Sequence, residues 1–154
     1  MDASDVLAAA RIKAVRVHPY LSAALFGLRP VRREGLGTCA VDAGMRLWYD
    51  PDFVVKWGAA AMSTVLVHEV MHVMRRHMKR LGQRDPQRWN IAADMEINDD
   101  IVSAGWSWPK DVQVCLPSMC GLDDGLTAEE YYELLPRKPQ DGEEIGRASC
   151  RERV

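Results

Sequence analysis

Residues Ala59–Leu81 read AAAMSTVLVHEVMHVMRRHMKRL, and they decide the fold. We predict one long helix here, because the stretch has no proline or glycine until Gly82 ends it. The helix carries an H-E-x-x-H motif at residues 68–72. At about 100° per residue, His68 and His72 lie on one face, one turn apart, so both imidazoles can reach a single ion. Zinc hydrolases use this geometry, and a third protein ligand and a water molecule complete their coordination.

Two other side chains of this helix need an interpretation. Glu69 lies beside the histidines, where it can take a proton from a water molecule whose pKa a metal has lowered. We therefore predict Glu69 as the catalytic general base. His77 falls on the opposite side of a straight helix, among apolar residues. We interpret it as a packed, hydrogen-bonded histidine that joins the metal only if the helix bends.

The third ligand is expected from the next helix, which contains N-I-A-A-D-M-E-I-N at residues 90–98. Its two acidic residues, Asp94 and Glu96, are about 200° apart and cannot both face inward. Asp94 shares a stripe with Ile97 and Ile101, so we predict that Asp94 faces the core and Glu96 faces water. A carboxylate within an apolar stripe is costly unless it is paired or metal-bound, which makes Asp94 the candidate ligand.

Asn90 and Asn98 lie one turn on either side of Asp94. We predict that their side-chain amides form hydrogen bonds to the Asp94 carboxylate or to a histidine and so orient the ligands. The alternative for Asp94 is an ion pair with Arg75 or Lys79 and no metal.

The rest of the chain predicts an α+β fold, with a small antiparallel sheet packed on helices around the central motif helix. Strand 46–49 is a candidate exposed strand that could pair with an extended peptide. The expected helices, with their start signals, are 2–17 with Ser4 as a possible cap, 20–28, 51–57 after Asp50-Pro51, 86–104 after Asp85-Pro86, and one from the T-A-E-E capping box at 127; the expected strands are 31–33, 38–41 and 46–49.

Composition bounds the class of protein. The 154 residues include 47% hydrophobic ones and carry a formal net charge of −2. No apolar stretch is long enough to span a membrane, and the four cysteines form no C-x-x-C pair, so we expect a soluble protein of the reducing cytoplasm. The negative charge argues against nucleic acid as a partner. A basic cluster nevertheless leaves a DNA-associated zinc protease as an alternative, and its members are Arg75, Arg76, Lys79, Arg80, Arg84 and Arg88.

Three further alternatives are open. Cys115 and Cys120, spaced C-x4-C, could hold a second metal. Tyr131 or Tyr132 could donate a hydrogen bond to an oxyanion. The last eleven residues, 144–154, resemble the one-frame translation of a sequencing adapter, so we expect them to be an artefact that follows a truncated linker at 137–143.

The runs HEVMHVMRRH at 68–77 and WNIAADMEIN at 89–98 resemble a metallopeptidase domain that precedes a von Willebrand factor A-like domain in bacterial and phage proteins. Residues 38–54 and 127–135 are also similar to that family, and the resemblance covers about residues 5–135. It implies a zincin-like fold, zinc bound by His68, His72 and Asp94, and Glu69 as the catalytic glutamate. It also implies a C-terminal partner domain that this chain lacks.

We therefore expect residues 1–136 to form a zincin-like metallopeptidase domain that hydrolyses amide bonds of a peptide or protein substrate. Zn²⁺ is the expected cofactor. The alternative is a non-catalytic binding module that a metal stabilises and that works with the missing C-terminal domain.

Overall fold

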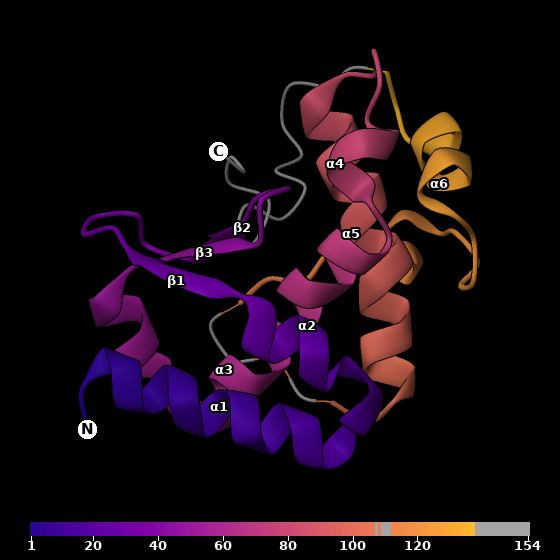
Figure 1. Ribbon diagram of the computed structural model, residues 1–154. Helices are drawn as coiled ribbons and strands as arrows, with labels where there is room; N and C mark the ends of the chain where they lie inside the picture. The colour runs from indigo at the N-terminus through magenta and orange to yellow at the C-terminus, as the bar shows by residue number, and fades with distance from the viewer. Residues whose placement is uncertain (107, 109–111, 138–154) are drawn as a thin grey trace. The chain divides into compact units, whose positions relative to one another are not determined.

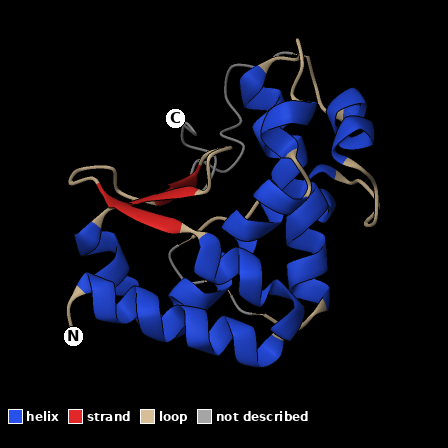
Figure 2. Ribbon diagram, viewed as in Figure 1, coloured by secondary structure: helices blue, strands red, loops and turns tan. Residues whose placement is uncertain are grey.

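The computed structural model describes residues 1–106, 108 and 112–137 (Figure 1). The chain forms two compact units. Met1–Met78 and Trp108 belong to the first, and Lys79–Trp106 with the described residues from 112 onward belong to the second. Helices dominate both, and three strands form one small sheet in the first unit, which confirms the α+β class (Figure 2). Over the described residues, no helix is both long and apolar enough to cross a membrane. The segments predicted as linker beyond 137 and as artefact at 144–154 lie outside the described residues.

The first unit begins with helix α1 (Ala3–Val17), followed by a 3-10 turn η1 (Pro19–Leu21) and helix α2 (Ser22–Gly27). The cap of α1 is Asp2, two residues before the predicted Ser4. Asp2 accepts a hydrogen bond from the Asp5 amide at 3.0 Å, and the Asp5 carboxylate accepts one from the Asp2 amide at 3.4 Å. This reciprocal capping box satisfies two amides that the helix itself cannot pair, which explains why Asp2 and not Ser4 is the cap.

The sheet contains β1 (Arg29–Arg32), β2 (Cys39–Val41) and β3 (Arg46–Tyr49) in the order β1-β3-β2. Strand β2 pairs antiparallel with β3, as expected, but β1 pairs parallel with it, so the sheet is mixed. The prediction that strand 46–49 is a free edge is wrong, because β3 is the central strand and is paired on both sides.

A carboxylate at the turn between β2 and β3 explains this order. Asp42 accepts hydrogen bonds from the amides of Gly44 and Arg46 and from the Trp48 indole, at 2.8, 3.2 and 3.1 Å. These bonds close a tight turn, with Met45 in the left-handed region at φ 61°. Because the turn joins β2 to one edge of β3, the other edge of β3 is left for β1, which pairs there.

Helix α3 (Pro51–Met74) carries the H-E-x-x-H motif. Its start is as predicted, with Asp50 as the cap and proline at the first position. Gly58 interrupts the helix at φ 70° and ψ 172°, a conformation that essentially only glycine adopts. The interruption lies between the two predicted helices, 51–57 and the one that begins at Ala59.

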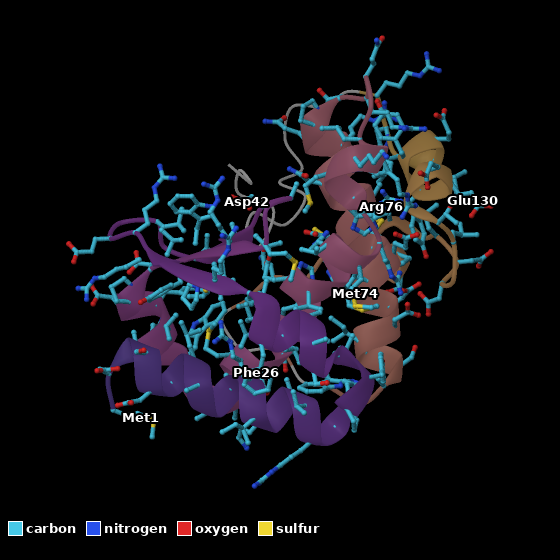
Figure 3. All side chains as sticks on the ribbon, in the orientation of Figure 1. Met1, Phe26, Asp42, Met74, Arg76 and Glu130 are labelled. Atoms are coloured by element: carbon cyan, nitrogen blue, oxygen red, sulfur yellow. The ribbon has the colours of Figure 1, made fainter. Side chains whose placement is uncertain are left out.

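The prediction that this helix continues to Leu81 is wrong. Helix α3 ends at Met74, and a separate turn of helix, α4 (His77–Arg80), follows (Figure 3). Arg76 lies between them in the left-handed region, at φ 57°. Its amide bonds to the carbonyl of Val73 at 3.0 Å, which tightens the last turn and redirects the chain. No proline or glycine announces this end in the sequence.

The core of the first unit lies where α1 and α2 pack against α3, and β2 contacts α3 as well. The buried apolar residues of these helices include Val6, Leu7, Ala10, Ala14, Leu25, Met62, Leu66 and Val70.

The second unit contains α5 (Pro86–Ser103), a 3-10 turn η2 (Pro117–Cys120) and α6 (Ala128–Leu134). The predicted caps are confirmed: Asp85 accepts from the Arg88 amide, and Thr127 forms a capping box with Glu130. Helices α5 and α6 pack together. Their shared core includes Trp89, Ala92, Ala93, Met95, Cys115, Ala128, Tyr131 and Leu135.

An ion triad covers the face of α5 that was expected to meet water. Glu96 is only 9% exposed, and both of its oxygens lie 3.2 Å from the Arg80 guanidinium. The same guanidinium binds Glu129 of α6. The prediction that Glu96 faces solvent is therefore wrong, and Asp99 is buried on this side too. The periodicity of α5 could not show that α4 and α6 would supply the missing cation and the cover.

The basic cluster is partly used in this packing. Arg84 and Arg88 lie over the ring of Tyr132, with their guanidinium carbons 5.7 and 4.0 Å from its centroid. Arg88 also donates hydrogen bonds to the carbonyls of Tyr132 and Leu135. With Arg80 in the triad, three of the six basic side chains hold the second unit together, which weakens the case for a DNA-binding surface.

The Gly58→Ala substitution tests the helix break. We expect it to destabilise the protein by about 1–3 kcal/mol, because alanine would have to adopt a backbone conformation that its Cβ disfavours. No steric clash contributes, since a Cβ at Gly58 meets no atom within 4 Å. Urea unfolding measures the change. The control is Gly27→Ala, at a helical glycine; an equal loss there would contradict the explanation.

The ion triad predicts that the stability of the folded protein depends on pH. The hydrogen bond from Arg80 lowers the pKa of Glu129. The ion pair therefore stabilises the folded state fully above about pH 4.3, the ordinary glutamate pKa. This stabilisation is lost as the pH falls through the lowered pKa of Glu129. We expect Glu129→Gln to remove under about 1 kcal/mol at pH 7, because the side chain is 37% exposed. Unfolding midpoints at pH 7 and pH 3 measure it, with exposed Glu133→Gln as control.

Candidate metal centre

The two histidines of the motif face one another inside the first unit, as the helical spacing predicts. His68 and His72 are 2% and 0% exposed. Their Nε2 atoms lie 2.9 Å apart, and their rings meet edge to face with centroids 4.5 Å apart. With a lone pair on each Nε2, both imidazoles could bind the same ion.

Asp94 completes a group that could hold a metal ion. His68, His72 and Asp94 each offer one ligand atom, and these three atoms all lie within 4.8 Å of one another. Asp94 is fully buried, as its stripe on α5 predicts. Over the described part of the chain, no other group of three or more such side chains is close enough. Among the residues that the structure describes, Cys115 and Cys120 are therefore not joined by further side chains that could complete a second metal site.

The donor set fits zinc. Two imidazoles and one carboxylate are ligands that zinc prefers, and they leave one tetrahedral position for water. Two nitrogens on one tetrahedral zinc ion, each about 2.05 Å from it, lie about 3.3 Å apart. The observed 2.9 Å is within a small side-chain rotation of that value.

Glu69, the predicted general base, is buried next to His68 in the sequence, with 5% of its surface exposed. The charge of Glu69 affects the thiol of Cys39 in β2. Burial, and after it the negative charge of Glu69, raises the pKa of the Cys39 thiol well above its ordinary range. Cys39 is not among the three residues whose ligand atoms come together.

Trp108 is a site residue that sequence reasoning missed. Its ring meets the His68 ring edge to face, with centroids 5.2 Å apart. Its indole N–H is buried and has no hydrogen-bond acceptor in the described structure. No sequence signal could have found it, because Trp108 lies forty residues from His68 in a segment without regular periodicity.

His77 is the packed, hydrogen-bonded histidine that was predicted. It is 1% exposed, and its Nδ1 lies 2.8 Å from Nδ1 of His72. Its predicted place on the opposite side of the helix is wrong, because the break at Arg76 turns it back toward His72. The exception foreseen for a bent helix therefore applies to its position.

The predicted supporting residues of α5 have different surroundings. Asn98 is fully buried, and its amide donates a hydrogen bond to the Cys115 carbonyl at 3.0 Å. Asn90 is half-buried. Support of the metal ligands by Asn90 and Asn98 stays a prediction.

The tyrosines of α6 have structural partners. The Tyr131 hydroxyl lies 2.9 Å from the Asp123 carbonyl and 3.2 Å from the Asp99 carboxylate, and burial raises its pKa to about 12. The Tyr132 hydroxyl accepts a hydrogen bond from the Asp85 amide. These contacts hold the second unit together and give no support to a role at an oxyanion.

The chain resembles known proteins in sequence. Residues 2–153 match the family described as "Putative metallopeptidase domain". The chain belongs to this family. A protein of Thermotoga maritima, described as "Uncharacterized protein", is 35% identical to this metallopeptidase-domain chain over 71 residues. That match covers 44% of the chain and 18% of the relative's length. No solved structure shows a significant match.

Two substitutions on α5 separate metal binding from folding. Asp94→Asn keeps the size of the side chain but removes its charge. Replacing a residue that only hydrogen-bonds to a metal ligand typically weakens metal affinity roughly 10- to 100-fold, and we expect Asp94→Asn to weaken zinc affinity by more than that. Glu96→Gln should leave the affinity within a few-fold and lower the unfolding midpoint, because it weakens the pair with Arg80. Titration against a chromophoric chelator measures the affinity. The opposite ranking would assign the third ligand to Glu96.

Proposed function

We propose that this domain is a zinc-dependent metallopeptidase that hydrolyses amide bonds of peptides or proteins. The observation that carries the proposal is the buried group of His68, His72 and Asp94, whose ligand atoms lie within 4.8 Å of one another beside the motif glutamate. Membership of a metallopeptidase-domain family supports the same class of reaction.

The residues divide into two roles. His68 and His72 would hold the metal through Nε2, and Asp94 would hold it through a carboxylate oxygen. A bound zinc ion would supply Lewis acidity, which lowers the pKa of a water molecule into the physiological range. Glu69 would accept a proton from the water as its oxygen bonds to the carbonyl carbon, and would pass that proton to the amine as the C–N bond breaks, so one carboxylate would act first as base and then as acid.

The charges of the ligands suit this chemistry. Two neutral imidazoles and one carboxylate carry a single negative charge, so a divalent ion among them keeps a net positive charge for catalysis. The ligands and Glu69 are each at most 5% exposed, and in such a site electrostatic interactions are stronger than in water.

We also propose that the chain acts in the cytoplasm, on peptide or protein substrates, and together with a C-terminal von Willebrand factor A-like domain. The proposed location rests on the spacing of the cysteines. The proposed partner domain rests on the resemblance of the motif helices to such two-domain proteins.

The decisive experiment replaces Glu69 with glutamine. We expect Glu69→Gln to lower the rate of cleavage of denatured, labelled casein by at least about 100-fold, because the general base is lost. Zinc should stay bound, because glutamine keeps the shape and the three ligands are unchanged. Cleavage is followed by fluorescence and zinc by elemental analysis.

The controls separate the proposal from its rival. Glu133→Gln, an exposed glutamate on α6, should keep full activity, and a chelator should abolish the wild-type activity reversibly. Loss of zinc from Glu69→Gln would contradict the role of Glu69. Zinc bound with no turnover in any variant would instead support a metal-stabilised binding module.

A further inference from the structure

We propose that His77 is a positioning residue that holds the proton of His72 on Nδ1 and so keeps Nε2 of His72 free to bind the metal. The inference rests on the proposed function, because it assumes that His72 is a metal ligand. His77 itself contacts neither the metal nor the substrate in this proposal.

The two ring nitrogens of His72 have different partners. Nε2 faces Nε2 of His68 at 2.9 Å, and Nδ1 faces Nδ1 of His77 at 2.8 Å. A nitrogen that binds a metal must offer its lone pair, so the proton of a neutral His72 is on Nδ1. That Nδ1–H can donate only to a lone pair, so Nδ1 of His77 is the acceptor and the proton of His77 is on its own Nε2.

The backbone is arranged to produce this contact. In a continuous helix, five residues of about 100° each would turn His77 roughly 140° away from His72. The chain instead leaves the helix after Met74 and passes through Arg76 at φ 57°, a conformation that side chains other than glycine rarely adopt. The break brings the two rings to a centroid distance of 5.0 Å. An unusual backbone conformation is thus used at the position that aims His77 at a ligand.

Burial makes the hydrogen bond matter. His72 and His77 are 0% and 1% exposed, so water cannot easily replace either partner. Without an acceptor, the Nδ1–H of His72 would be a buried donor without a partner, which costs free energy and favours another tautomer or ring orientation. Loss of such support behind a metal-binding histidine typically weakens metal affinity 10- to 100-fold.

The test compares the zinc affinity of the full chain with that of three variants, by competition with a chromophoric chelator. We expect His77→Leu to weaken the affinity 10- to 100-fold, because leucine cannot accept a hydrogen bond. His77→Asn should stay within a few-fold of wild type, because its Oδ1 replaces the accepting Nδ1. His18→Leu, which removes a histidine that meets the Tyr20 ring edge to face, should leave the zinc affinity unchanged.

A second measurement does not depend on the stability of the variants. Long-range ¹H–¹⁵N NMR spectra of the zinc-loaded wild type should show His72 protonated at Nδ1 and His77 at Nε2. Protonation of His77 at Nδ1 would overturn the proposal, as would equal affinities of wild type and His77→Leu. An equal loss in the leucine and asparagine variants would also overturn it, because only the accepting atom should matter. If the wild type itself binds no zinc, the proposed function fails first.

Discussion

Placing two imidazole nitrogens 2.9 Å apart, out of contact with water, is the constraint on which the rest of this structure depends. Two such lone pairs repel each other unless a proton or a cation lies between them. A helix is the simplest scaffold for the pair, because positions four apart share a face. Helix α3 packs against α1, and both histidines are buried.

The polar groups around the pair follow from the same constraint. Each imidazole has a second nitrogen, and for His72 the chain satisfies it from His77 across a break in the helix. Trp108 covers the edge of His68 with an aromatic ring. The two carboxylates Asp94 and Glu96 have different surroundings. Asp94 is close to the histidines, whereas Glu96 forms an ion pair with Arg80. A second acid of α5 is thereby used in an ion pair and does not add to the charge of the metal ligands.

What could be predicted depended on how local the physical signal was. The H-E-x-x-H face, the caps at Asp50, Asp85 and Thr127, and the burial of Asp94 follow from spacings within one helix or turn, and the structure agrees with them.

The errors came from contacts between elements. The burial of Glu96 depends on Arg80 and Glu129, and the parallel pairing of β1 depends on which edge of β3 was free. The end of α3 has a different reason, because Arg76 adopts a left-handed backbone that its residue type does not announce.

Cys39 has a consequence for which metals this site would select. A thiolate there would add a soft, negatively charged donor near the glutamate and would favour copper(I) or a purely structural zinc site. Cys39 is not one of the three grouped residues, and burial and the neighbouring carboxylate raise the pKa of its thiol, so the donors of the group are nitrogen and oxygen. Such a donor set would leave a bound divalent ion electrophilic.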